Sequence, residues 1–296
     1  MRRFKGRKMQ SGLSLAFVGA GRLAQSLAPA WVQQGLRVVA VASRQMVSAQ
    51  ALAQRLPGCE ALPAEQAVAR ADLVFITTPD DAIAATVAAL PWRPGQAVVH
   101  CSGASELSVL RAAEQAGAGI GGFHPLQIFS DPELARARLS GAVAAIEASA
   151  PLRGTLWHLA QVLGMRPIEL PPGSRARYHG AASFAASFML SLLDEAVQVL
   201  YSLGLDSDQA LQALLPLARG TLDSAESRGL AGALSGPISR GDVAVIARHL
   251  EAFQGLGAAH LGLYRDLALR QLDLARRSRR LSDDQLSALA QLLSAA

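Results

Sequence analysis

Apolar residues in the first half of the chain occur in short runs, separated by segments with helical spacing. Residues 13–18 form a strand-like run, and residues 23–34 continue with apolar positions at helical intervals. This alternation predicts an α/β domain with a parallel, doubly wound sheet of the Rossmann type. Further strands are predicted at residues 36–42, near Cys59, and at 72–78, 97–101, 143–147 and 165–170, with helices at 47–56, 64–70, 106–116 and 151–163.

The pattern changes after Pro171-Pro172-Gly173, because strand-like segments give way to helical spacing alone. We therefore predict a Rossmann domain over residues 13–172 and an all-α domain over 173–296, preceded by a flexible basic tail at 1–12. Asp242 is the expected N-cap of one helix of the second domain. The helices predicted there span residues 175–203, 207–227, 241–253, 257–278 and 282–296.

A glycine turn joins the first predicted strand to the first helix, in the order Gly19-x-Gly21-x-x-Ala24. A glycine at position 19 permits a tight turn, and one at 21 lets a pyrophosphate approach the backbone. The helix that follows directs free N–H groups and a positive dipole end at the phosphates. This order of elements is typical of dinucleotide binding.

The end of the second predicted strand indicates which dinucleotide is bound. An acidic residue there would bind the ribose 2′-hydroxyl of NAD, but the chain has Ser43 and Arg44 instead. A guanidinium binds a phosphate as a planar fork. We therefore expect NADP to be preferred over NAD.

Two other patterns are not assigned to chemistry. The sequence Gly117-x-Gly119-x-x-Gly122 repeats the glycine spacing, but Phe123-His124-Pro125 follows it in place of a helix, so we expect a turn and a strand. Asp80 and Asp81 stand at a predicted helix start, where carboxylates usually act as caps.

Composition narrows the class of protein. The 296 residues are 51% hydrophobic and 17% charged, which predicts a compact globular protein. Two cysteines, Cys59 and Cys101, form no disulfide framework or metal knuckle, so we expect a cytoplasmic protein without a metal. Basic clusters in the first eight residues and at 276–280 belong to no nucleic-acid module, and we expect no nucleic-acid partner. No membrane partner is expected, since residues 180–193, the longest apolar candidate, are interrupted by serines.

Candidate chemistry lies at the predicted carboxyl ends of strands, where open α/β sheets bind their ligands. The residues at these ends are Thr77, Thr78, Pro79, Ser102, Gly103, His124 and Gln127. His124 is favoured among these residues because Pro125 restricts its backbone. His100 falls inside a strand and fits a core position equally well. The first helix of the second domain carries a polar stripe that begins at Tyr178 and His179 and continues through Ser183. Its apolar residues Phe184, Phe188, Leu192 and Val197 are assigned to the core, and Arg175, Arg177 and Arg240 are candidates for binding a substrate carboxylate.

The candidate site consists of two groups. The predicted catalytic residues are His179, His124, Tyr178, Ser102 and Ser183. The predicted cofactor-binding residues are Gly19, Ala20, Gly21, Arg22, Leu23, Ser43, Arg44, Thr77, Thr78, Pro79, Ser102 and Gly103.

Together these motifs resemble a bacterial family that joins a Rossmann-like NADP-binding domain to a helical domain of unknown function. Its relatives include pyrroline-5-carboxylate reductase and, more distantly, 6-phosphogluconate and 3-hydroxyacid dehydrogenases. The resemblance extends over residues 13–280 and implies a reductase fold, NADP and a homodimer formed by the helical domains. The motifs, in order, are the glycine turn, Thr78-Pro79-Asp80-Asp81-Ala82-Ile83, His100-Cys101-Ser102-Gly103-Ala104, Phe123-His124-Pro125-Leu126-Gln127, Tyr178-His179 with Phe184, and residues 236–242.

Two departures affect the expected chemistry. Ser187 stands where relatives tend to carry asparagine, and the lysine and asparagine pair of the hydroxyacid dehydrogenases is missing. Imine reduction tolerates a weaker acid, because the substrate can arrive already protonated. We therefore expect an NADP-dependent oxidoreductase acting on a small carbonyl or imine compound. A non-catalytic NADP-binding sensor or scaffold and a decarboxylating dehydrogenase are the alternatives.

Overall fold

The structure, a computed structural model, describes residues 12–294. The predicted basic tail therefore lies, apart from Gly12, outside the described residues. The chain divides into two compact units, Met1–Ser183 and Phe184–Ala296. This division falls within helix α8 (Arg175–Ala185), just after the boundary proposed from the sequence.

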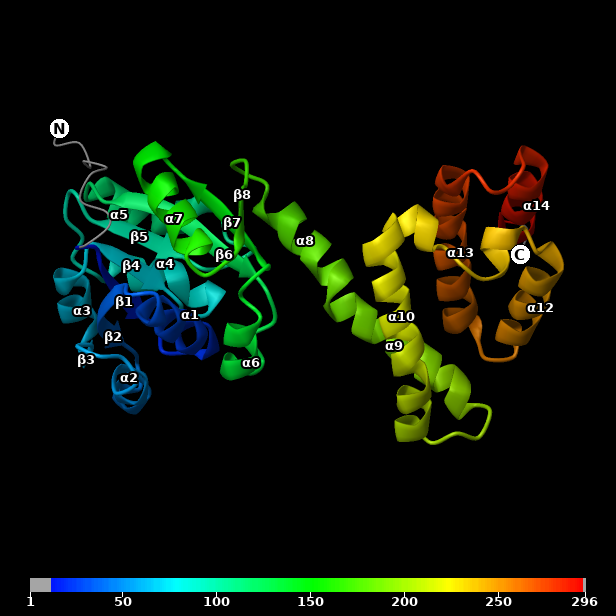
Figure 1. Ribbon diagram of the computed structural model, residues 1–296, viewed down its shortest axis with the longest axis horizontal. Helices are drawn as coiled ribbons and strands as arrows, with labels where there is room; N and C mark the ends of the chain where they lie inside the picture. Colours follow the sequence, from blue (N-terminus) through cyan, green and yellow to red (C-terminus); the bar gives the residue numbers. More distant parts are fainter. Residues whose placement is uncertain (1–11, 295–296) are drawn as a thin grey trace. The chain divides into compact units, whose positions relative to one another are not determined.

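The first unit contains a single eight-stranded sheet (Figure 1). Neighbouring strands follow the order β3-β2-β1-β4-β5-β6-β7-β8, and β1 to β6 pair in parallel. The strand order reverses between β1 and β4. Such a reversal opens a crevice beyond the carboxyl ends of these two strands. The strands are β1 (Ser14–Val18), β2 (Arg37–Ala42), β3 (Glu60–Ala61), β4 (Leu73–Ile76), β5 (Ala97–His100), β6 (Gly119–Leu126), β7 (Val143–Ala148) and β8 (Arg166–Glu169).

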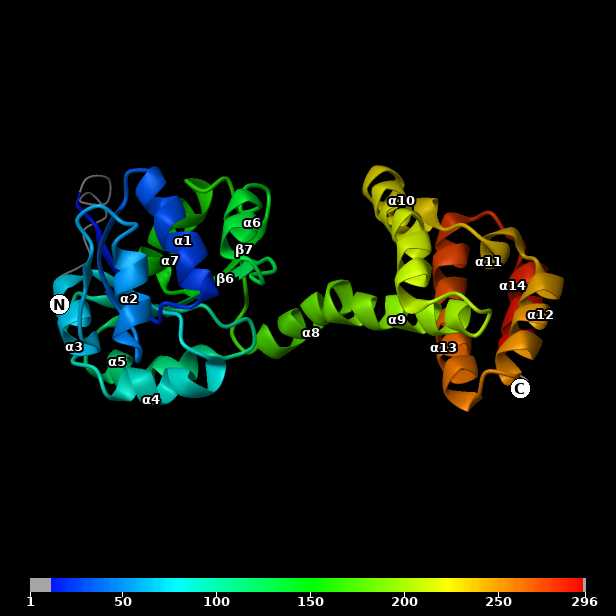
Figure 2. The same ribbon diagram turned by 90° about the horizontal axis from the view of Figure 1, so that it is seen from below.

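Helices cover both faces of this sheet (Figure 2). Side chains of α1 (Arg22–Gln33), α2 (Met46–Ala53) and α7 (Ala150–Gln161) form the core of one face. The other face is covered by α3 (Ala64–Arg70), α4 (Ile83–Ala88) and α5 (Arg111–Gln115). These layers confirm the predicted Rossmann-type fold.

An aromatic cluster forms the centre of the first core. Phe17, Trp31, Phe75 and Phe123 are fully buried, and their neighbouring ring centroids lie 4.7 to 6.0 Å apart. The Trp31 indole N–H donates to the Leu159 carbonyl oxygen at 2.9 Å. Helices α1 and α7 are thereby held on the same side of strands β1, β4 and β6.

One strand runs against the predicted direction. Strand β7 pairs antiparallel with β6, although the sequence predicted a wholly parallel sheet. A parallel return requires a crossover that carries the chain back along the sheet. The only helix in this connection is the short α6 (Pro132–Ala137), which the sequence analysis missed.

The long helix predicted at residues 175–203 is two helices. Helix α8 ends at Ala185 and α9 (Ser187–Tyr201) follows, because Ala186 leaves the helical region with φ −122° and ψ −84°. The predicted helix 106–116 is likewise divided into a 3₁₀ turn (Leu107–Leu110) and α5. Neither break has a proline or glycine signal at its position.

The second unit is all-helical, as predicted. Its core comes from α11 (Pro237–Arg240), α12 (Val243–Gln254), α13 (Ala258–Ser278) and α14 (Asp283–Ser294). Asp242 caps α12 by accepting from the Val245 N–H, which confirms the predicted N-cap. Helix α10 (Ser207–Ala233) packs on α9 and is kinked at Gly229, where φ is +68°.

The apolar residues assigned to the core of this region are only partly buried. Val197 is 7% exposed, but Phe184, Phe188 and Leu192 are 72%, 47% and 41% exposed, so their assignment to the core was wrong. The segment Arg175–Tyr201 also has the length and composition of a membrane-spanning helix. A single such helix is weak evidence, and the cytoplasmic location stays a prediction.

We expect the core of the first unit to depend on Leu156, which is fully buried on α7. Leu156→Ala should lower the free energy of unfolding by about 2–5 kcal/mol, because a buried leucine leaves a cavity. Leu134→Ala is the matched control, since Leu134 is 58% exposed and should cost less than about 0.5 kcal/mol. Tryptophan fluorescence during urea unfolding reports this unit selectively, because Trp31, Trp92 and Trp157 all lie in it. Equal effects of the two substitutions would contradict the packing described.

Candidate active site

The glycine turn after β1 is fixed by close contact with the end of β4. Gly19 has φ +117°, and a Cβ at this position would lie 2.6 Å from the Thr77 carbonyl carbon and oxygen. The Thr77 hydroxyl donates to the Gly19 carbonyl oxygen at 2.8 Å. Both the positive φ and the contact with the Thr77 main chain therefore exclude a side chain at position 19, which agrees with the tight turn predicted.

Gly21 differs from Gly19, because nothing in the described chain requires it to be glycine. Its φ is −74°, which any residue adopts, and a Cβ there would meet no atom within 4 Å. It precedes the first residue of α1, Arg22, whose side chain is exposed. The missing side chain thus leaves open space at a helix N-terminus, where backbone N–H groups and the helix dipole attract an anion.

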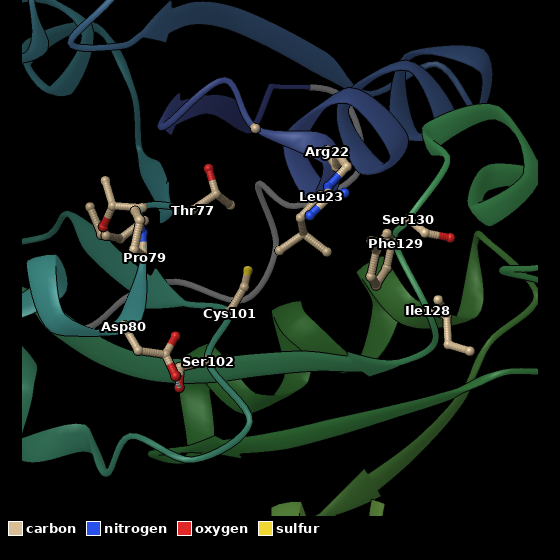
Figure 3. A pocket seen from close by; sticks show the side chains of 13 residues that line it. Arg22, Leu23, Thr77, Pro79, Asp80, Cys101, Ser102, Ile128, Phe129 and Ser130 are labelled. Atoms are coloured by element: carbon tan, nitrogen blue, oxygen red, sulfur yellow. Dashed lines mark hydrogen bonds between the residues drawn. The ribbon is translucent and has the colours of Figure 1, made fainter. Parts of the chain in front are cut away.

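A cleft of about 630 Å³ lies over this turn (Figure 3). Thr77 and Pro79 line one side, the loop after β6 lines the opposite side, and Leu23 lies between them. The buried Thr78 hydroxyl has no hydrogen-bond partner among the described residues. An unpaired polar atom in such a wall is suited to a polar ligand. The lining residues are Gly21, Arg22, Leu23, Ile76, Thr77, Thr78, Pro79, Asp80, Cys101, Ser102, Ile128, Phe129 and Ser130.

The sequence analysis missed one wall of this cleft. Ile128, Phe129 and Ser130 follow β6 and face the glycine turn across the cleft. These three residues were difficult to predict, because a loop that follows a strand has no hydrophobic periodicity. Gln127, in contrast, uses its side-chain amide within its own loop, donating to the Arg138 carbonyl and accepting from the Ile128 N–H.

A second hollow of about 550 Å³ continues from the glycine turn to the end of β2. Ala20 and Gly21 line it together with Ser43 and Arg44, the two residues predicted to bind a 2′-phosphate. Gln45 and Ser48 complete the lining and were not predicted. The two hollows share Gly21, so they meet at the N-terminus of α1.

Asp80 does not cap a helix, so that prediction is wrong. The 3₁₀ turn Asp80–Ala82 shows no side-chain cap, and the Asp80 carboxylate accepts from the Ser102 hydroxyl at 2.6 Å. The Ser102 Oγ in turn accepts from the N–H groups of Ala104 and Ser105. Asp80 and Ser102 therefore form one polar group at the carboxyl ends of β4 and β5, within the cleft.

Three predicted catalytic side chains meet beside the end of the cleft. The His124 Nδ1 lies 2.8 Å from the Tyr178 Oη, and the rings of His124 and His179 are 6.3 Å apart. Gly103, the residue after Ser102, lies against both histidines. A Cβ at Gly103 would fall 2.7 Å from His179 Cδ2 and 3.0 Å from His124 Nε2. The cleft and the histidine cluster are thus neighbours in one unit.

Burial favours the neutral forms of His124 and Tyr178. Desolvation, together with the charges of His179 and Arg175 and against an opposing effect of Asp80, lowers the pKa of His124 to about 4. Burial also raises the pKa of Tyr178 to about 12, although Arg175 opposes this shift. Between these pKa values the hydrogen bond joins a neutral phenol to a neutral imidazole.

Ser183 and the arginines of α8 occupy other positions. The Ser183 hydroxyl donates to the His179 carbonyl oxygen at 3.2 Å, one turn earlier on the helix. Arg175 is fully buried and paired with Glu147. Contrary to the expectation from the sequence, it is therefore not available to bind a substrate carboxylate. Arg177 is exposed, and Arg240 belongs to the second unit.

His100 lies inside strand β5 with its ring fully buried. Burial, followed by the charges of Arg175 and His124, lowers its pKa to about 3, so the ring is neutral. It does not line the cleft, which favours the core position over the site position. Within residues 12–294, no cluster of three or more histidine, cysteine or acidic side chains is arranged to hold a metal ion.

Comparisons with known proteins match two family models to the chain, and the second match begins within the first structural unit, just before β7. Residues 4–125 match the Rossmann-like domain family. Residues 142–271 match the family described as Domain of unknown function (DUF2520). No curated protein matches the sequence.

Solved structures resemble the chain over most of its length. Protein TM1727 from Thermotoga maritima is 23% identical with a TM-score of 0.75, covering 90% of this chain and 100% of that one. A candidate NADP oxidoreductase, BF3122 from Bacteroides fragilis, is 27% identical with a TM-score of 0.69, covering 90% and 98%. A reductive aminase from Aspergillus terreus in complex with NADPH is 19% identical with a TM-score of 0.63, covering 94% and 98%.

Proposed function

We propose that this chain, which joins a Rossmann-like domain to a DUF2520 domain, is an NADP-dependent reductase of a small imine or carbonyl compound. The observation that carries the proposal is the placement of the His124–Tyr178 hydrogen bond beside the dinucleotide cleft. The names of two solved relatives, an NADP oxidoreductase and an NADPH-bound reductive aminase, support the oxidoreductase class.

The cofactor assignment follows the two hollows. The N-terminus of α1 with Gly21 and Arg22 binds the pyrophosphate, and Ser43 and Arg44 bind the 2′-phosphate. The walls formed by Thr77, Thr78 and the loop after β6 then enclose the rest of the dinucleotide. When bound, the nicotinamide supplies a hydride, and the protein is left to orient the substrate; a proton must be delivered as well only to a carbonyl or an unprotonated imine.

The charges around the cluster favour an imine. Asp80 places a carboxylate at the substrate end of the cleft, where it attracts a protonated imine and repels a carboxylate. Neutral His124 and Tyr178 are weak acids, which suffices for a substrate that already carries its proton. Tyr178 donates to His124 in one arrangement and can turn its hydroxyl proton toward the substrate in another.

We expect Arg44→Ala to weaken NADPH binding by about 10- to 100-fold, because a hydrogen bond to a charged group contributes about 1.5–3 kcal/mol. NADH binding should change less than twofold. Arg37→Ala is the matched control, since Arg37 is exposed at the opposite end of the same strand. The measurement is a titration followed by tryptophan fluorescence. Equal loss for both nucleotides would contradict the role of Arg44.

We expect Tyr178→Phe to lower kcat by about 100-fold, because the hydroxyl that orients the substrate toward the hydride is lost, while NADPH affinity stays within twofold. The substrate is first identified by following NADPH oxidation with a panel of cyclic imines, ketoacids, hydroxyacids and amino acids. Tyr201→Phe is the matched control, because Tyr201 is 60% exposed in the second unit. Tight NADPH binding with no turnover of any compound would favour a non-catalytic NADP sensor instead.

We further propose a homodimer formed through the helical unit. Large apolar side chains there are between 53% and 72% exposed, which is unusual for a monomer in water. They belong to α8, α9, α10 and the loop between α9 and α10: Phe184, Leu190, Leu203, Leu217, Leu222 and Leu230.

Sedimentation velocity should therefore give twice the chain mass of 30.9 kDa. Leu217→Lys combined with Leu222→Lys should shift the protein toward the monomer, since two charges enter the buried interface. Leu134→Lys, an exposed leucine of α6 in the first unit, should leave the dimer unchanged. A wild-type monomer that binds phospholipid vesicles would instead indicate that these side chains face a membrane.

A further inference from the structure

Arg175, the first residue of α8, carries the most deeply buried charge near the candidate site. Arg175 is 0% exposed, and its Nε lies 2.7 Å from the Glu147 Oε2 on β7. Its Nη1 donates to the Ser102 carbonyl oxygen at 3.0 Å, at the end of β5. One guanidinium thus joins a helix to the ends of two strands.

Strand β6 lies between β5 and β7, and Gly122 on this strand leaves space for the Arg175 side chain. A Cβ at Gly122 on β6 would lie 1.8 Å from the Arg175 Nη2. Gly122 is not among the described glycines with positive φ, so the conformation of its backbone does not require glycine. The absence of a side chain at position 122 is therefore explained by the space that Arg175 occupies. The glycine spacing that imitates a dinucleotide motif ends at this residue.

The backbone of α8 is held at the same place by a second carboxylate. Glu106 accepts from the Arg175 N–H at 3.1 Å with one oxygen and from the Gly173 N–H at 3.2 Å with the other. A carboxylate at a helix N-terminus pairs with its free N–H groups and its positive dipole end. The first turn of α8 is consequently anchored through both its main chain and its side chain.

This anchor determines where the catalytic candidates lie. Tyr178 and His179 follow Arg175 by three and four residues, so all three occupy one face of the helix. The guanidinium also holds the Ser102 carbonyl, and the next residue, Gly103, contacts both histidines. Arg175 therefore contacts the segments that position Tyr178 and Gly103, as well as the strand that carries His124.

Stability alone does not account for such a pair. Two buried charges lose their hydration, and replacing both by neutral residues of similar volume is often neutral or stabilising. In some proteins a buried pair of this kind instead fixes one arrangement of the groups around it.

We propose that Arg175, held by Glu147 and admitted by Gly122, is a positioning residue that sets the Tyr178 hydroxyl against His124. The inference rests on the proposed reductase function for its kinetic test. It also has a test that needs no turnover, so the two can fail separately.

The kinetic test is a double-mutant cycle in the full chain with NADPH and the best imine of the panel. Arg175→Met with Glu147→Gln removes both charges, whereas Arg175→Lys keeps both charges and removes the planar guanidinium fork. We expect kcat to fall at least tenfold in each, with NADPH affinity within twofold. In a Tyr178→Phe background the same changes should alter kcat less than twofold, because the hydroxyl they position is gone. Equal losses in both backgrounds would overturn the proposal.

The matched control is Arg153→Met with Glu169→Gln, which removes an exposed ion pair of the same unit. It should leave kcat and its coupling to Tyr178 unchanged. A comparable fall in kcat for this control would show a general effect of lost charge.

The test without turnover uses side-chain ¹⁵N NMR of the histidine-labelled protein, with the His124 signals assigned through His124→Gln. Arg175→Lys should move these signals to where Tyr178→Phe moves them, since both remove the phenol from Nδ1. Unchanged His124 signals would overturn the positioning role even if a reductase activity exists. The expected NMR change without any turnover would retain the positioning role and reject the reductase.

Discussion

The site depends on the close approach of the turn after β1 to the end of β4. A Cβ at Gly19 would meet the Thr77 main chain at 2.6 Å, so the two strand ends can be adjacent only with glycine there. This contact directs the N-terminus of α1 into the crevice where the strand order reverses. The phosphate-binding backbone, the threonine wall and the hollow beside Arg44 all follow from that geometry.

The sequence predicted the parts of this architecture that local rules govern. Short apolar runs located most strands, helical spacing located most helices, and the glycine turn located the cleft. Prediction from the sequence failed where long-range packing determines the structure. The antiparallel direction of β7 depends on how a connection returns along the sheet, and Ala186 breaks a helix without a local signal. Among the site residues, strand ends were identified, whereas Ile128, Phe129 and Gln45 lie in loops without periodicity and Ser48 is a polar residue of α2 with no signal of its own.

Arg175 shows a further limit of reading residues one at a time. In the sequence it is an arginine at the start of a largely apolar helix, where it was a candidate for binding a substrate carboxylate. Its burial becomes intelligible only with Gly122 and Glu147, which lie on two neighbouring strands. The charge, its counterion and the space it needs are separated in the chain. That these three residues belong together can be recognised only when the register of β6 and β7 is known.

The electrostatics of the cluster and its chemistry are consistent with each other. A site built to protonate a strongly basic alkoxide benefits from an acid with a pKa near the working pH. Here burial moves His124 and Tyr178 in opposite directions, to about 4 and about 12, so neither is such an acid at neutral pH. An iminium carries its own proton and becomes a neutral amine when it accepts a hydride. The reaction then needs a carboxylate such as Asp80 to attract the cation, and neutral groups that orient it without repelling it. For the imine substrate that we propose, the site therefore needs no strong acid.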